Sequence, residues 1–196
     1  MSTTSNLDVT QEIKLDHDNV RDLWTRFQAA SARDEKSAIA NTLIREMAIH
    51  SDAEEISVYN DYERLGLSGT AEQNKEEHAE VKKLVYEADS ASTKSADYDS
   101  ILGKAVQAFL AHAQEEEDEQ HNILRAHLTP EENDKIARAF LKARKKVPSR
   151  PHPSAPQTGQ AAQKAAGMFG SVHDKIIETI GGRDFVELKY NHPESV

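Results

Sequence analysis

LGKAVQAFLAHAQEEEDEQHNIL, residues 102–124, is the stretch that decides the fold, because an apolar stripe runs through it at helical spacing and then turns polar. Side chains three or four residues apart lie on one face of a helix, so this stripe is expected to face a core. The inward positions are Leu102, Ala105 or Val106, Phe109, His112, Glu116, Gln120 and Ile123. A carboxylate at a core position is costly unless a positive charge lies beside it. The stretch therefore predicts a packed helix with a buried polar group that needs a partner.

Three further amphipathic helices precede this one, and each places one histidine on its inward stripe. We expect them over residues 8–30 and 34–65, the second ending at Gly66, and from a capping box at Thr70-Ala-Glu-Gln73. The inward positions are Ile13, His17, Val20, Trp24 and Phe27, then Leu43, Met47, His50, Glu54 and Val58, then Ala71, Asn74, His78, Val81 and Val85. No strand pattern competes. Long helices with short connections predict an all-α fold, an antiparallel up-and-down four-helix bundle.

The chain changes character after these four helices. A fifth helix is predicted from the box Thr129-Pro-Glu-Glu132 to about residue 146. A proline-rich strap follows, then a short helix over about 160–180, and final residues that lie over the surface or fray. We therefore divide the chain into a bundle with a capping fifth helix, residues 8–147, and a strap with a short C-terminal helix, residues 148–196.

Composition excludes several classes of function. The formal net charge of -10 disfavours nucleic acid and membrane surfaces as partners. The absence of cysteine excludes disulfides, thiolate metal sites and cysteine nucleophiles, and leaves His, Asp and Glu as possible metal ligands. No secretory signal or membrane-length apolar run is found, so we expect a soluble cytoplasmic protein, a monomer or a homodimer.

Two of the inward histidines are followed four residues later by an inward glutamate, His50 by Glu54 and His112 by Glu116. Each pair delivers an imidazole and a carboxylate to the same interior point, one helical turn apart. A single core histidine is more often an ordinary hydrogen-bonded residue, and one such pair arises easily by chance. The conjunction of four histidines and two glutamates on stripes without Lys or Arg favours a metal centre.

Ligand type narrows the choice of metal. Four imidazoles and two carboxylates suit zinc, copper, manganese or iron. Six ligands are too many for one tetrahedral zinc, so we predict two metals that share the glutamates, with two histidines each and room for an oxo or hydroxo bridge and a small exogenous ligand. Iron best matches a bridged, redox-capable, open site. The Glu-x-x-His motif of ferritin-like di-iron bundles does not occur here.

This order of residues resembles the hemerythrin-like proteins with an HHE cation-binding domain. The resemblance covers about residues 8–156 and rests on Leu15-Asp16-His17, His50-Ser-Asp-Ala-Glu54-Glu55, Glu77-His78 and His112-Ala-Gln-Glu-Glu116-Glu117. It implies a non-haem di-iron centre. The implied terminal ligands are His17, His50, His78 and His112, and the implied bridges are Glu54 and Glu116.

The chain departs from the oxygen-carrying members of that family, which have a fifth histidine four residues after the third. Lys82 stands at that position, and Glu117 stands where those proteins have an aspartate; we interpret Glu117 as a solvated glutamate rather than a ligand. Tyr59 and Tyr62 are interpreted as rim residues of the bundle, the alternative being that they hydrogen-bond or ligate near the centre. The remaining histidines are left out of the site, namely His121, His127, His152, His173 and His192.

Three classes of function are consistent with this pattern. The first is a di-iron protein that binds and reduces dioxygen, hydrogen peroxide or nitric oxide, for which the missing nitrogen ligand argues against simple oxygen transport. The second is a di-iron oxygenase or oxidase acting on an organic substrate. The third is a bundle that stores or donates iron, or a metal-free interaction module.

Overall fold

The computed structural model describes residues 6–152, 174 and 182–193, and over these residues the chain is helical without any strand. The fold class predicted from the sequence is confirmed. The elements are α1 (Val9–Ala29), α2 (Arg33–Ser57), α3 (Tyr59–Arg64), α4 (Ser68–Ser90), α5 (Tyr98–Glu115), the π-helix η1 (Glu116–Gln120), α6 (His121–His127) and α7 (Pro130–Arg144).

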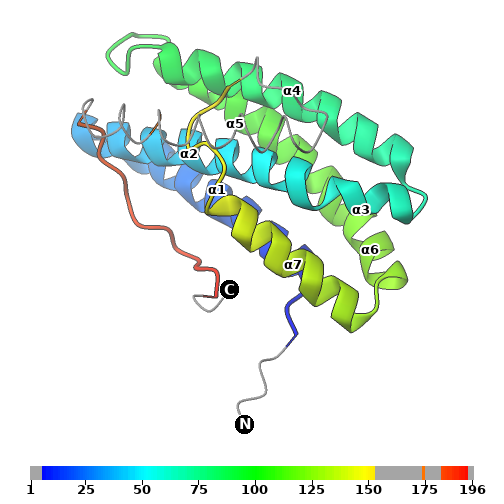
Figure 1. Ribbon diagram of the computed structural model, residues 1–196. Helices are drawn as coiled ribbons and strands as arrows, with labels where there is room; N and C mark the ends of the chain where they lie inside the picture. Colours follow the sequence, from blue (N-terminus) through cyan, green and yellow to red (C-terminus); the bar gives the residue numbers. More distant parts are fainter. Residues whose placement is uncertain (1–5, 153–173, 175–181, 194–196) are drawn as a thin grey trace.

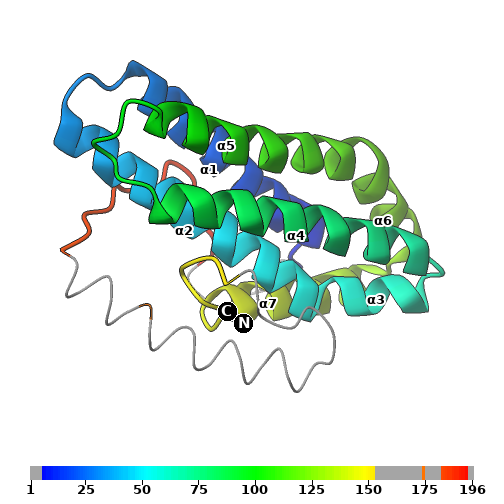
Figure 2. The same ribbon diagram turned by 90° about the horizontal axis from the view of Figure 1, so that it is seen from above.

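Four long rods form the bundle (Figure 1). The rods are α1, α2 continued by α3, α4, and α5 continued by η1 and α6; α1, α2, α4 and α5 contact one another around the bundle axis. The fifth helix, α7, packs against α1 and α2 on the outside of this ring. Figure 2, seen from above, shows α5 and α1 on one side of the bundle and α4 and α2 on the other.

The apolar core falls into two clusters with polar residues between them. One contains Leu23, Leu43 and Phe109, and the other contains Ile13 and Phe140. Along α1, Ile13 of the second cluster precedes His17, and the first cluster begins beyond it. The histidine layer is therefore sealed by hydrocarbon at both ends of the bundle.

Local sequence signals set some of the helix ends. The Asp8 side chain accepts a hydrogen bond from Thr10 N, and Thr129 forms the predicted capping box with Glu132. Gly66 adopts the left-handed conformation, with φ of 76°, in the turn after α3. The predicted start of the next helix at Thr70 is wrong: α4 begins at Ser68, because this turn lets Leu67 O accept from Ala71 N.

Two predicted helices are interrupted. The second predicted helix breaks at Val58, where α2 ends and α3 begins. The fourth contains a π-helical turn in which His121 N donates to Glu116 O, five residues earlier. The extra residue rotates the remainder of the rod about its axis, so that His121 and Leu124 are buried while Ile123 is only half-buried.

The first predicted helix is confirmed with one adjustment. Leu23 takes the fully buried position, whereas Trp24 is half-buried. The Trp24 ring stacks on Phe27 with 5.4 Å between centroids, and a Cβ added to Gly103 would lie 3.4 Å from the ring. The indole thus packs directly against Gly103, between the first and fourth rods.

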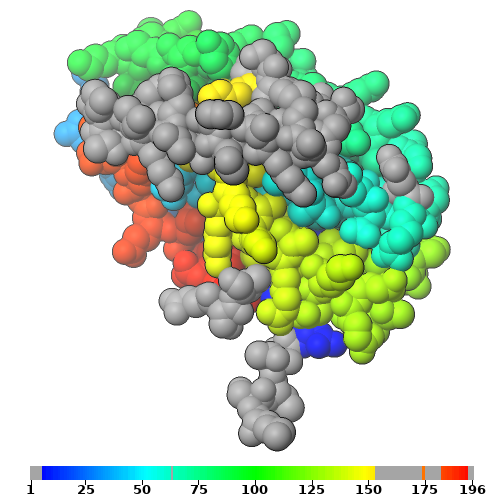
Figure 3. Space-filling view, viewed as in Figure 1, coloured from blue at the N-terminus to red at the C-terminus, as the bar shows by residue number. Residues whose placement is uncertain are grey.

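The described end of the chain, residues 182–193, lies along the outside of α1 and α2. In Figure 3 its side chains form part of the surface beside α7. The expectation that the final residues lie over the surface is met for this stretch. The helix predicted over 160–180 falls outside the described residues except at residue 174, which is helical, and the two-part division of the chain stays a prediction. None of the helices in the described ranges has the length and apolarity needed to cross a bilayer.

Candidate metal centre

All six residues singled out from the sequence meet in the middle of the bundle. They come from four different rods: His17 from α1, His50 and Glu54 from α2, His78 from α4, His112 from α5 and Glu116 from η1. None of these side chains belongs to a residue more than 4% exposed. Their possible ligand atoms form three overlapping groups within 4.8 Å: His17, His50 and Glu116; His50, Glu54 and His78; Glu54, His112 and Glu116.

The four imidazoles form two pairs across the site. His17 Nε2 lies 3.3 Å from His50 Nε2, and His78 Nε2 lies 2.9 Å from His112 Nε2. Carboxylate oxygens flank both pairs: Glu54 Oε2 is 3.3 Å from His50 Nε2 and 3.6 Å from His78 Nε2. Every Nε2 atom therefore points to the centre, where it would face a cation.

The opposite nitrogen of each imidazole faces a carboxylate. The Nδ1 contacts are His17 to Glu117 at 2.9 Å, His50 to Asp16 at 3.2 Å, His78 to Glu55 at 3.3 Å, and His112 to Glu77 at 2.6 Å. Such contacts fix the Nδ1–H tautomer and leave Nε2 free as a ligand. Each of these carboxylates is next in sequence to one of the six central residues and contacts the histidine of the neighbouring rod. The four contacts therefore form a closed ring around the bundle.

Two buried oxygens have no hydrogen-bond partner, Glu54 Oε1 and Glu116 Oε2. A buried carboxylate oxygen without a partner is strongly unfavourable, and here two of them lie beside four imidazole nitrogens. A metal centre gives both oxygens a partner and supplies the missing positive charge. The donor set, nitrogen and oxygen without sulfur, fits first-row transition metals.

Comparison with known proteins agrees with this geometry. The sequence model of the family described as hemerythrin HHE cation binding domain matches residues 8–124. The chain belongs to this hemerythrin family. An uncharacterized hemerythrin-like protein of Schizosaccharomyces pombe is 30% identical over 171 residues, which cover 86% of this chain and 84% of the yeast protein. No solved structure matches the chain.

Burial and neighbouring charges give chemically similar groups of this hemerythrin-type site different pKa values. Burial and the charge of Glu54 raise the pKa of Glu116 to about 7. Burial also opposes ionisation of Glu54, but His50, His112 and His17 together outweigh it and lower the Glu54 pKa. Burial alone would lower the pKa of His50, yet Glu54 and Asp16 raise it to about 10, whereas burial lowers that of His17 to about 4. Protons held here have to leave when a cation binds.

Glu117 is not the solvated residue expected from the sequence. Its side chain is 14% exposed and bonds both His17 Nδ1 and, at 2.8 Å, Arg21 Nη1. Burial would raise the pKa of this carboxyl, but the hydrogen bonds from His17 and Arg21 lower it to about 2. Glu117 thus supports His17 from the outside of the site.

Lys82, at the position of the fifth histidine in oxygen-carrying relatives, points away from the centre. Its Nζ lies 2.6 Å from Asp52 and 2.8 Å from Glu55. Burial would lower the pKa of Lys82, but these two carboxylates raise it. The lysine therefore keeps its charge and braces Glu55, the carboxylate that His78 faces.

The interpretation of Tyr59 and Tyr62 as rim residues is wrong, because each is only 1% exposed. Tyr59 Oη lies 3.0 Å from Glu54 Oε2, 3.3 Å from Glu116 Oε1 and 3.2 Å from His78 Nε2. Tyr62 Oη donates to Gln120 Oε1 at 3.1 Å. The break at Val58 turns both rings into the bundle, and the sequence carries no proline or glycine at this point to announce it.

A layer of amides lies next to the site. Asn74 and Gln120 exchange hydrogen bonds, from Asn74 Nδ2 to Gln120 Oε1 at 2.8 Å and from Gln120 Nε2 to Asn74 Oδ1 at 2.9 Å. Asn74 Nδ2 also lies 3.1 Å from Glu116 Oε1. Both amides lie on the predicted inward stripes: Asn74 holds Glu116 directly, and Gln120 holds Asn74.

The histidines left out of the site behave in different ways. His121 is buried beside it: its ring is parallel to that of His17 at 6.3 Å, and its Nε2 has no hydrogen-bond partner. It belongs to none of the three ligand groups. His127 is exposed and bonds Ile123 O, His152 contacts Asp174, and His173 is outside the described residues. His192 reaches Asp16 from the end of the chain, at 2.8 Å.

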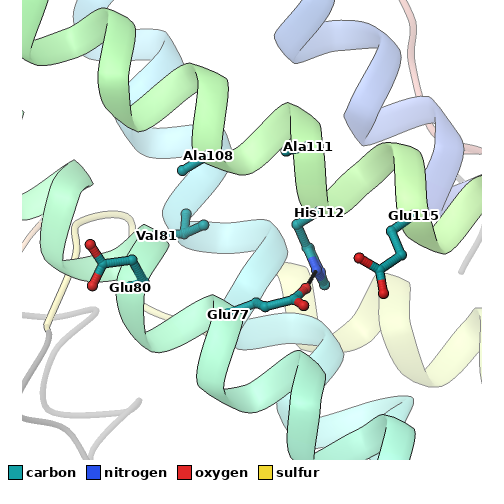
Figure 4. A pocket seen from close by; sticks show the side chains of 7 residues that line it. All are labelled: Glu77, Glu80, Val81, Ala108, Ala111, His112 and Glu115. Carbon is teal, nitrogen blue, oxygen red and sulfur yellow. Dashed lines mark hydrogen bonds and ion pairs between the residues drawn. The ribbon is translucent and has the colours of Figure 1, made fainter.

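A pocket of about 220 Å³ opens between α4 and α5 beside His112 (Figure 4). Its lining residues are Glu77, Glu80, Val81, Ala108, Ala111, His112 and Glu115. Glu80 and Ala111 are exposed, whereas His112 is 4% exposed, so the pocket leads from solvent to the edge of the site. Figure 4 shows Glu77 meeting the imidazole of His112 across it.

Proposed function

We propose that this chain holds two iron ions in a non-haem di-iron centre and uses them to bind and reduce a small oxidant, namely dioxygen, hydrogen peroxide or nitric oxide. The observation that carries the proposal is the pair of unpartnered buried oxygens, on Glu54 and Glu116, between two pairs of converging imidazoles. Membership of the hemerythrin family, whose domain binds cations, supports it.

In this proposal His17 with His50 and His78 with His112 would hold the two irons, together with Glu54 and Glu116. Ferrous iron bound there would supply the electrons that reduce the oxidant. The protein supplies orientation: Asp16, Glu55, Glu77 and Glu117 fix the imidazole tautomers from outside. Tyr59 and Asn74 hold the inner carboxylates by hydrogen bonds.

The pocket beside His112 is the proposed route for the small ligand. It has an apolar side, Val81 and Ala108, and it ends against the one imidazole of the site that has measurable exposure. A diatomic molecule or a peroxide needs no wider path. Because Lys82 replaces a nitrogen ligand and stays in its ion pairs, reduction rather than reversible transport is the favoured outcome.

The decisive experiment is metal analysis with an optical spectrum of the anaerobically reduced protein before and after air is admitted. We expect about two irons per chain and a new ferric charge-transfer band after oxidation. His50→Ala and Glu116→Ala are expected to lose iron, with Gln114→Ala, on the exposed face of the same rod as Glu116, as the control.

Other outcomes would contradict the proposal in distinct ways. A folded protein that takes up no iron would favour a metal-free bundle. Iron uptake far above two per chain would favour storage. Oxygen consumption that requires an added organic substrate would favour an oxygenase or oxidase.

A further inference from the structure

The segment formed by residues 182–193 has no regular secondary structure, yet it is tied to the bundle along its length. At its start Arg183 Nη1 pairs with Asp89 Oδ1 of α4 at 2.6 Å. In its middle Val186 N donates to Thr42 Oγ1 at 3.0 Å, and Val186 and Leu188 pack against the first apolar cluster. The segment is thus packed on the bundle by both polar and apolar contacts.

Buried polar groups on the bundle receive this segment. Asn19 of α1 is 1% exposed, and its side-chain amide forms a reciprocal pair with the backbone of Tyr190, donating to the carbonyl and accepting from N–H, both at 3.0 Å. Without the segment the Asn19 amide would lose both partners. Since buried amides are rarely left unpaired, this surface of α1 is matched to the docked segment.

The end of the segment contacts Asp16, the carboxylate that faces the proposed metal ligand His50. His192 Nε2 lies 2.8 Å from Asp16 Oδ1, and His192 Nδ1 lies 2.7 Å from Glu12 Oε2. The other Asp16 oxygen, Oδ2, faces His50 Nδ1 and also accepts from Arg144. Asp16 is 1% exposed and His50 fully buried, so an unbroken chain of contacts runs from the C-terminal segment to the centre.

We propose that His192 is a positioning residue of the metal centre: by holding Asp16 against His50 Nδ1, it couples docking of segment 182–193 to retention of the metal. The proposal rests on the proposed function, since it requires that His50 bind a metal. Partners that orient ligating histidines typically change metal affinity 10- to 100-fold when removed. The matched family domain ends at residue 124, so this support comes from outside it.

Coupling of this kind is reciprocal. If docking of the segment favours the metal-bound geometry of His50, then bound metal favours docking by the same factor. The amides of Val186 and Tyr190, which donate to Thr42 and Asn19, report docking directly. Their hydrogen exchange is therefore expected to be slower in the iron-loaded protein than in the iron-free protein.

The test uses the full chain loaded with ferrous iron, and it measures iron release to a ferrous chelator, iron per chain and global stability. His192→Ala is expected to release iron about tenfold faster or more, and His192→Gln, which keeps one N–H for Asp16, to recover much of the native rate. Leu188→Ala is the matched control: it removes apolar contacts of the same segment, but the anchors at Thr42, Asn19 and Asp16 remain, so iron release should stay close to the native rate.

Each result decides a different question. Native-like release from His192→Ala, or equal exchange of the Val186 and Tyr190 amides with and without iron, would overturn the coupling. Equally fast release from Leu188→Ala and His192→Ala, at equal loss of global stability, would reduce His192 to a structural role. If the native chain itself bound no iron, the proposed function would fail, and this inference with it.

Discussion

Tyr59 Oη lies 3.0 Å from Glu54 Oε2, because the chain breaks at Val58 and turns the first residue of α3 back toward the last turns of α2. In an unbroken helix, residues five apart do not share a face as residues four apart do. The break therefore gives Glu54 Oε2 a hydroxyl donor, while Glu54 Oε1 has no hydrogen-bond partner.

Tyr59→Phe is expected to lower the unfolding free energy of the iron-free protein by about 1.5–3 kcal/mol, the usual contribution of a hydrogen bond to a charged group. We also expect faster iron loss, because Glu54 is no longer held. Chemical unfolding and chelator kinetics measure the two effects. Tyr62→Phe is the control, since its hydroxyl contacts Gln120 instead, and it should leave iron release unchanged.

Glu116→Gln gives a prediction for pH. The pKa of Glu116 is raised from 4.5 to about 7 in the folded iron-free protein, so its stabilising contribution is full below pH 4.5 and is lost as pH rises through 7. Glutamine does not ionise, so Glu116→Gln does not lose this stability as pH rises. Its stability relative to the native iron-free protein should therefore grow by roughly 3 kcal/mol between those limits.

The measurement is urea unfolding of both chelator-treated proteins at several pH values from 4.5 to 8. A stability difference that does not change with pH would show that Glu116 is ionised throughout. The same variant is expected to bind less iron, so the substitution should stabilise one state of the protein while impairing the other.

The amide pair next to the site makes a third prediction. Asn74→Ala leaves the Gln120 amide without its reciprocal partner inside the bundle and should cost about 1–3 kcal/mol. In a double-mutant cycle with Gln120→Ala, the double variant should lose about 0.5–3 kcal/mol less stability than the sum of the two single variants. Additive costs would mean that the amides act independently. Gln114→Ala, at an exposed position, should change stability by no more than about 0.5 kcal/mol.

Ala108→Phe tests the pocket beside His112. The ring is expected to fill the space between α4 and α5 and to slow oxidation of the reduced protein several-fold, with iron per chain unchanged. Stopped-flow mixing with air-saturated buffer gives the rate. Gln107→Phe adds the same ring at an exposed neighbouring position and should oxidise at the native rate. An unchanged rate in Ala108→Phe would place the access route elsewhere.

The four rods and the six central residues could be predicted from the sequence because helical periodicity records which side chains face inward. His17, His50, His78 and His112 interrupt apolar stripes, and the structure buries all four together. Periodicity carries no such information about surface positions. Glu77 and Glu117 therefore look like ordinary solvated acids until the rods are assembled, although their places directly beside His78 and Glu116 are a signal that could have identified them.

The breaks in the rods could not be predicted for a related reason. Val58 is neither glycine nor proline, and residues 116–120 contain neither, so local propensity gives no warning of the two interruptions. The docking of His192 on Asp16 spans 176 positions of the chain. Contacts at that separation depend on the finished surface of α1 and α2 rather than on any pattern in the segment itself.

The π-helical turn has a consequence for insertions and deletions. Removing one residue from 116–120 would restore regular α-helix and rotate everything beyond it by about 100°. Leu124 would then leave the apolar cluster it occupies, although no inward side chain had been replaced. In this part of the chain the number of residues between Glu116 and Leu124 determines which side chains face inward. An engineered variant therefore has to keep that number even where it changes the residue types.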